Sequence, residues 1–262
     1  MERRPVFRFP LSNLLHSPTA QYVRFGFMRF YLVAPLVVMI TTFWSIMTVV
    51  SRPFDRQARF YHWILRTWSR TLLALFGIRV AITGTEHLDR SQSYVYLANH
   101  ASYLDIIVVG ATLPDEIRFV LKRELGRIPI FGWGLALGPY ILIDRADARN
   151  AMASIEKGAA DIRNGASVII FPEGTRTSDG NLAPFKRGGF MLAIRSGVPM
   201  APVAIRGTYR LMSRHDRTVK SGKVTVTIGH PIQGNSDATR AEAAAIQEQV
   251  RAQLMEMLRD EL

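Results

Sequence analysis

The sequence YVYLANHASYLD at residues 94–105 passes from an apolar, β-branched run into a helical pattern within a few residues. Residues 94–98 predict a buried strand, and residues 103–111 predict a helix. The same alternation recurs from residue 77 onward, with further predicted strands at 79–83, 118–121, 140–143, 167–171, 200–205 and 223–228, and further helices at 148–163, 188–195 and 236–262. This pattern favours an α/β fold with a mixed, mainly parallel sheet flanked by helices.

Within this stretch, His100 and Asp105 stand five positions apart, where a strand turns into a helix. That spacing lets the carboxylate reach one imidazole nitrogen and leaves the other nitrogen to accept a proton, as in a base held by an orienting acid. The alternative is a structural histidine, which is the more common state of a single histidine, and a chance pair with this spacing would not be surprising among six histidines. The pair alone therefore leaves both interpretations open.

The second candidate is FPEGTR at residues 171–176, directly after a predicted strand. Proline and glycine predict a sharp turn at the carboxyl end of that strand, where open α/β sheets bind ligands. Arg176 is suited to bidentate contact with a phosphate, and Lys186 adds a cation at the start of a predicted helix. The alternative is a plain surface turn with an exposed arginine.

The pattern of the N-terminal residues predicts association with a membrane. No charged residue occurs between Arg29 and Arg52, and an apolar run of this length spans roughly 30 Å as a helix. Both flanks are basic, which favours a helix that dips into one leaflet over a simple span. Residues 54–76 then form a basic amphipathic pattern typical of an interfacial helix. We therefore expect a membrane-associated two-helix element in residues 1–76 and a catalytic domain in residues 77–262; a buried core helix and an ordinary surface helix are the alternatives.

The composition restricts the partners and the chemistry. The 33 Lys and Arg exceed the 21 Asp and Glu, and the resulting net charge of +12 indicates an anionic partner. The absence of cysteine excludes disulfides, thiolate metal sites and a cysteine nucleophile. The cations cluster near the apolar N-terminus instead of interleaving with aromatic residues, which argues against nucleic acid. No second histidine or carboxylate cluster near His100 completes a metal site.

Taken in order, the motifs resemble the glycerolipid acyltransferase family, and above all its 1-acylglycerol-3-phosphate (lysophosphatidic acid) acyltransferases. The resemblance covers residues 94–203 and rests on N-H-x4-D at 99–105, Lys122, the block 138–145, FPEGTR at 171–176 and VPMAPV at 198–203. It implies the glycerol-3-phosphate acyltransferase-like fold, with His100 as general base and Asp105 as its orienting acid. It also implies direct attack on an acyl thioester without an acyl-enzyme, so Ser102 is not expected to act as a nucleophile.

The resemblance further implies a set of substrate-binding residues: Asn99, Lys122, Arg145, Glu173, Gly174, Thr175, Arg176 and Lys186. An apolar groove for the acyl chain is expected around Ile130, Phe131, Trp133 and Leu135. The implied co-substrate is acyl-CoA or acyl-carrier protein, with no metal and no other cofactor. The expected acceptor is lysophosphatidic acid, with another lysolipid such as lyso-ornithine lipid as the alternative and a non-enzymatic basic membrane protein as the remote one. The expected location is the cytoplasmic face of the inner membrane.

Overall fold

The computed structural model of the protein describes residues 18–54, 59–143 and 148–259. The chain forms two compact units, Met1–Met39 and Ile40–Leu262. Helix α1 (Pro18–Ser51) supplies the described part of the first unit and continues into the second. All other helices and strands described below belong to the second unit.

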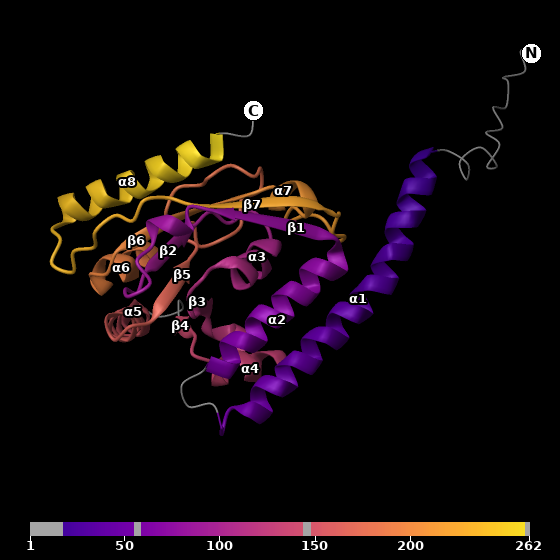
Figure 1. Ribbon diagram of the computed structural model, residues 1–262, viewed down its shortest axis with the longest axis horizontal. Helices are drawn as coiled ribbons and strands as arrows, with labels where there is room; N and C mark the ends of the chain where they lie inside the picture. The colour runs from indigo at the N-terminus through magenta and orange to yellow at the C-terminus, as the bar shows by residue number, and fades with distance from the viewer. Residues whose placement is uncertain (1–17, 55–58, 144–147, 260–262) are drawn as a thin grey trace, which may run out of the picture. The chain divides into compact units, whose positions relative to one another are not determined.

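The second unit is built on a seven-stranded sheet in the order β1-β7-β6-β2-β5-β3-β4 (Figure 1). The strands are β1 (Ile78–Thr83), β2 (Val95–Ala98), β3 (Ile117–Lys122), β4 (Ile141–Ile143), β5 (Ser167–Ile170), β6 (Met200–Arg206) and β7 (Gly222–Ile228). Every neighbouring pair is parallel except β6 with β7. The mixed, mainly parallel sheet that the sequence predicted is therefore confirmed, as are all seven predicted strands.

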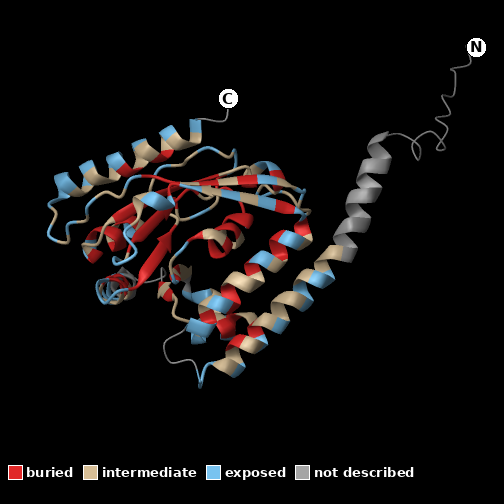
Figure 2. Cartoon of the chain, viewed as in Figure 1, coloured by how far each residue is buried: buried red, intermediate tan, exposed pale blue. Residues whose placement is uncertain are grey.

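Helices cover both faces of this sheet. The helices after β1 are α3 (Leu104–Thr112), α4 (Phe131–Leu137), α5 (Ala148–Arg163), α6 (Arg187–Ser196), α7 (Thr208–Leu211) and α8 (Arg240–Arg259), with short 3-10 turns at Thr85–His87 and Arg123–Arg127. One continuous core joins α5, α6 and α8 to alternate residues of the central strands, such as Val95 and Leu97 of β2. Helix α3 lies against the opposite face (Figure 1), and the buried residues gather on the central strands and the inward helix faces (Figure 2).

The parallel pairing places three strand ends beside one another. Strand β2 pairs with β5 on one side and with β6 on the other, all three running in the same direction. The carboxyl ends of these strands lead into residues 99–105, 171–176 and 207–211. Because ligands bind beyond the carboxyl ends of strands in such sheets, this edge positions the candidate site.

Helix α2 (Arg59–Phe76) differs from the interfacial helix expected at residues 54–76, whose positions 55–58 lie outside the described residues. One face of α2 is buried through Ile64, Leu72 and Phe76, and it packs against α3 and β1. Arg66 donates hydrogen bonds to the carbonyl oxygens of residues 113–115 just after α3. The buried face therefore fits the surface-helix alternative.

Helix α1 contains the candidate membrane element. Within the described residues, Val33–Ser51 is the one segment long and apolar enough to cross a bilayer, and only 11% of it is buried. A core helix would be mostly buried, so this exposure argues against the core-helix alternative for α1.

Candidate active site

His100 and Asp105 form the centre of the site. The imidazole Nδ1 lies 2.8 Å from Oδ2 of Asp105, whose side chain is fully buried, while the His100 side chain remains 14% exposed. A neutral imidazole that donates from Nδ1 keeps a lone pair on Nε2. The arrangement therefore supplies an oriented base with its second nitrogen free of the carboxylate.

The loop before α3 fixes Asp105 from several directions. Its Oδ2 also accepts the backbone N–H groups of Ala101 (2.7 Å) and Ser102 (2.8 Å). Asp105 stands in the first turn of α3, where the helix dipole favours a negative charge. Ser102 is fully buried, and its hydroxyl oxygen accepts the N–H of Leu104, so it supports this turn.

The backbone of His100 is held by the 171–177 segment. Its N–H donates to Oε1 of Glu173 at 2.6 Å, and its carbonyl oxygen accepts the N–H of Thr177 at 2.9 Å. The imidazole stacks on the ring of Phe171 with the ring centres 4.2 Å apart. The ring plane, the peptide and the carboxylate contact together leave the imidazole little freedom to rotate.

Glu173 connects two loops. Its Oε2 accepts the N–H of Ala183 at 2.8 Å, so each carboxylate oxygen receives a backbone donor, and the residue is 1% exposed. Burial raises the pKa of Glu173 to about 7, and this effect outweighs the two N–H donors, which lower the pKa. Glu173 was expected to bind substrate; with both oxygens bound to backbone, it is better described as a positioning residue.

Asn99 also differs from its expected role. Its amide oxygen accepts the N–H of Ile205 at 2.7 Å, and its amide nitrogen donates to the carbonyl oxygen of Ile205 at 2.9 Å. The side chain is 4% exposed and ties the end of β2 to β6. Because its amide is already bonded at both ends, Asn99 positions the neighbouring His100.

Arg176 lies close to Tyr103, which directly precedes α3. Its guanidinium carbon stands 3.3 Å from the ring centre of Tyr103, a cation–π contact. Its Nη1 is buried without a hydrogen-bond partner among the described residues. A buried guanidinium donor without a partner suits an anionic ligand, as the sequence predicted for this residue.

The remaining predicted substrate-binding residues lie in the 171–176 turn, at the start of α6, at the end of β3 and outside the described residues. Gly174 adopts a left-handed φ of 69°, where a Cβ would meet the Lys186 side chain at 2.9 Å, so glycine allows this turn and the lysine stem to lie together. Thr175 and Lys186 are exposed. Lys122 is the last residue of β3, whereas Arg145 lies outside the described residues.

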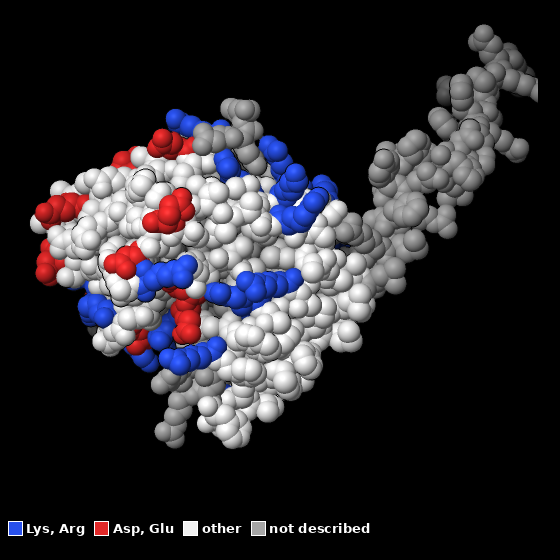
Figure 3. All heavy atoms as spheres, in the orientation of Figure 1, with Lys and Arg blue, Asp and Glu red and all other residues white. Residues whose placement is uncertain are grey.

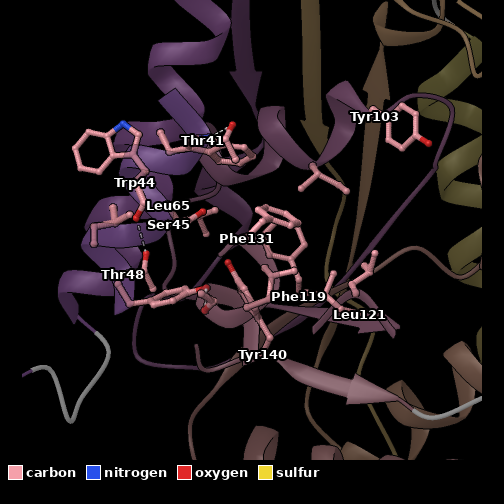
Figure 4. A pocket seen from close by; sticks show the side chains of 17 residues that line it. Thr41, Trp44, Ser45, Thr48, Leu65, Tyr103, Phe119, Leu121, Phe131 and Tyr140 are labelled. Atoms are coloured by element: carbon pink, nitrogen blue, oxygen red, sulfur yellow. Dashed lines mark hydrogen bonds between the residues drawn. The ribbon is translucent and has the colours of Figure 1, made fainter. Parts of the chain in front are cut away.

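An apolar cavity of about 260 Å³ lies beside this site (Figure 4). Its walls come from α1, α2, α3, β3 and α4 and include Trp44, Leu65, Ile106, Phe119 and Phe131. In Figure 4, Trp44 and Thr48 stand on one side and Tyr103 on the other, with Phe119, Phe131 and Tyr140 between them. Tyr103 thus lines the cavity and also contacts Arg176.

The expected acyl-groove residues are only partly correct. Phe131 and Leu135 line the cavity, but Ile130 and Trp133 do not. Helical periodicity explains the difference, because Trp133 of α4 points away from the face shared by Phe131 and Leu135 and is 55% exposed. The sequence reasoning also missed Tyr103, although it lies inside the 94–105 stretch, and Phe171, although it opens FPEGTR.

Comparisons with known proteins show the family of this chain. A family model described as Acyltransferase matches residues 79–206. The chain is 32% identical to a 1-acyl-sn-glycerol-3-phosphate acyltransferase of Chlamydomonas reinhardtii, over 91% of this chain and 70% of that protein. It is 35% identical to a chloroplastic 1-acyl-sn-glycerol-3-phosphate acyltransferase of Brassica napus, over 70% of this chain, and spans about half (53%) of the length of that relative.

A solved structure gives the same result. The crystal structure of the 1-acyl-sn-glycerophosphate (LPA) acyltransferase PlsC from Thermotoga maritima matches with a TM-score of 0.71 and 26% identity, over 88% of this chain and 93% of that one. The fold and these similarities thus define the glycerolipid acyltransferase class. Within that class, the chain belongs to the family of 1-acyl-sn-glycerol-3-phosphate acyltransferases.

Proposed function

We propose that this protein transfers a fatty acyl group from an acyl thioester to the free hydroxyl of lysophosphatidic acid, giving phosphatidic acid for phospholipid biosynthesis. The observation that carries the proposal is the meeting of three features at one sheet edge: the oriented base His100, the buried donor of Arg176, and an apolar cavity. Tyr103 contacts Arg176 and lines the cavity. An amphiphile with a phosphate, a hydroxyl and an apolar chain fits this combination.

In the proposed reaction, Nε2 of His100 removes the proton from the acceptor hydroxyl as its oxygen bonds to the thioester carbonyl carbon. Asp105 stays ionised and stabilises the imidazolium through the 2.8 Å contact with Nδ1. The tetrahedral intermediate collapses by breaking the carbon–sulfur bond, and the imidazolium returns its proton to the thiolate. These reaction steps need no acyl-enzyme and no cofactor. The co-substrate is acyl-CoA or acyl-carrier protein.

Arg176 is proposed to bind the phosphate of the acceptor. A guanidinium offers a planar pair of donors to phosphate oxygens, and its stacking on Tyr103 fixes the plane of those donors. Lys122, Arg145, Thr175 and Lys186 are proposed as further contacts around the head group or the donor arm.

The cavity is proposed to hold the transferred acyl chain. Each methylene buried there contributes about 0.8 kcal/mol, roughly a fourfold change in binding per carbon. Donors of increasing chain length should therefore improve in KM by about this factor until the cavity is full and then stop improving.

The membrane location is supported by α1 and by the surface around it. Figure 3 shows few charged atoms over the described parts of α1, α2 and α4, whereas charged side chains gather elsewhere on this face. Large apolar side chains are exposed there, including Phe43, Trp63 and Trp133. Such a surface suits lipid, and surrounding cations would add about 1 kcal/mol each on an anionic leaflet. We propose the cytoplasmic face of the inner membrane, where acyl thioesters are made.

The test is acyl transfer to lysophosphatidate by membranes that carry the protein. His100→Ala should lower kcat by about 10²–10⁴-fold or more, because it removes the general base. His215→Ala, a change of an exposed histidine far along the chain, is the matched control and should keep full activity. Wild-type transfer no faster than that of His100→Ala would refute the proposal. A panel that includes lyso-ornithine lipid, which lacks phosphate, tests the part given to Arg176.

A further inference from the structure

A second pocket, of about 480 Å³, lies at the carboxyl end of β6. It is lined by Arg206 at the end of β6, by Thr208 and Arg210 of α7, and by Asn99 and Ala101, which flank His100 in the chain. We call it the Thr208 pocket. Since the sheet order is β6-β2-β5-β3, it stands on the β6 side of His100, whereas the apolar cavity is walled by β3. The reacting histidine thus lies between two different openings.

The charge in this pocket is mainly positive. Among the described residues, Arg206, Arg210 and Arg259 line it against one acidic residue, Asp179. The carboxylate of Asp179 is bound within its own turn by the side-chain amide and the backbone N–H of Asn181, and these bonds lower its pKa. On the face drawn in Figure 3, Lys and Arg atoms gather near the C-terminal end of α8, where Arg259 stands. The pocket is therefore suited to an anion.

Two buried polar atoms in the wall of the pocket have no partner among the described residues. They are Oγ1 of Thr208, in a residue that is only 1% exposed, and Nε of Arg206. The guanidinium of Arg206 is fixed from its other end, since Nη1 donates to the carbonyl oxygen of Met257 at 3.2 Å. Unsatisfied buried polar groups are uncommon in native proteins and call for an explanation such as a missing ligand. A hydroxyl and a guanidinium N–H are both donors that a phosphate oxygen accepts.

We propose that the Thr208 pocket binds the phosphate of the acyl donor's 4′-phosphopantetheine arm. The inference rests on the proposed function and deepens it. With the acceptor phosphate at Arg176 and the acyl chain in the cavity on the β3 side, the donor's arm must leave His100 in another direction. The Thr208 pocket, on the β6 side, is lined by Asn99 and Ala101, the chain neighbours of His100, and offers donors for an anion. Coenzyme A and acyl-carrier protein share this phosphate, so the proposal holds for either as the donor.

Thr208→Val is the decisive variant because it keeps the shape of the side chain and removes only the hydroxyl. The test compares two donors that differ by one phosphate, an acyl-4′-phosphopantetheine and the corresponding acyl-pantetheine. Thr208→Val should raise KM for the phosphorylated donor about tenfold, because one hydrogen bond to a charged group is lost. The KM values for acyl-pantetheine and for lysophosphatidate should not change. The Tm should stay the same or rise, since no protein hydrogen bond to the hydroxyl is lost.

A second variant and a matched control complete the test. Arg206→Met should weaken the phosphorylated donor further, while Arg79→Met, a change of an exposed arginine on the outer strand β1, should change neither donor. Running acyl-CoA and acyl-carrier protein in parallel shows which donor the pocket serves. The proposal is overturned if Thr208→Val raises KM for both small donors equally, raises KM for lysophosphatidate instead, or leaves all KM values unchanged.

A binding measurement separates this inference from the proposed function. Calorimetric titration with 4′-phosphopantetheine and with pantetheine needs no catalysis. Wild-type protein should bind the phosphorylated compound about tenfold more tightly than Thr208→Val does, and both should bind pantetheine equally. If the wild type transfers no acyl group yet shows this difference, only the proposed reaction fails; an active wild type without the difference refutes only the pocket.

Discussion

Glu173 offers the sharpest test of how the site is held together. The structure places a carboxyl group, 1% exposed, between the N–H groups of His100 and Ala183. Burial raises its pKa from 4.5 to about 7. The folded protein therefore binds this proton more tightly than the unfolded chain does, and the protonated form is the one that favours folding. The associated stability is fully present below about pH 4.5 and is lost as the pH rises through about 7.

The size of the effect follows from the shift. At about 1.4 kcal/mol per pKa unit, ionising Glu173 in the folded state costs at most about 3.5 kcal/mol across this window. For a chain of this size, that corresponds to roughly 5–10 °C in Tm. The neutral variant Glu173→Gln has no such titration, and subtracting its pH profile from that of the wild type cancels the other titrating groups.

The assay is thermal unfolding in detergent micelles between pH 4.5 and 8. The wild type should lose stability relative to Glu173→Gln as the pH rises, with most of the change between pH 4.5 and 7. Glu248→Gln, which removes a charge from an exposed position on α8, should run parallel to the wild type. A difference between wild type and Glu173→Gln that is flat with pH, or that grows in favour of the wild type at pH 8, would refute this reasoning.

Three further variants separate residues that act in catalysis from residues that stabilise the fold. Asp105→Asn should lower kcat by about 10²–10⁴-fold with little change in KM, because the amide neither stabilises an imidazolium nor fixes its tautomer; activity within threefold of wild type would contradict the proposed pair. Ser102→Ala should keep most of kcat and lose about 1 kcal/mol of stability, since its hydroxyl only accepts the N–H of Leu104, and loss of all transfer would point to a nucleophilic serine instead. Arg66→Met should lower the free energy of unfolding by about 1–3 kcal/mol, because the carbonyl oxygens of residues 113–115 lose their donor. The KM values for the acyl donor and for lysophosphatidate should not change. Chemical denaturation and steady-state kinetics on the same preparation check both expectations.

The local chain patterns determined much of this protein in advance. Apolar β-branched runs bounded by turns placed every strand of the sheet, because such runs have few alternatives to a buried strand. The pairing of His100 with Asp105 was also accessible, since five residues at a strand-to-helix turn bring the two side chains together without help from the rest of the chain. The apolar run of α1 was readable for the same reason: its length and composition are local properties.

Only the tertiary structure decided what the neighbouring residues do. Glu173 meets the His100 peptide across 73 positions of sequence, and Asn99 meets Ile205 across 106, so both contacts depend on the register of β2 with β5 and β6. The same pairing leaves the hydroxyl of Thr208 buried without a partner among the described residues, and the packing of α2 brings Arg66 to the carbonyl oxygens just after α3. The sequence thus specified the chemical groups, because motifs are local, whereas their roles depended on strand register and helix packing, which only the folded chain brings together.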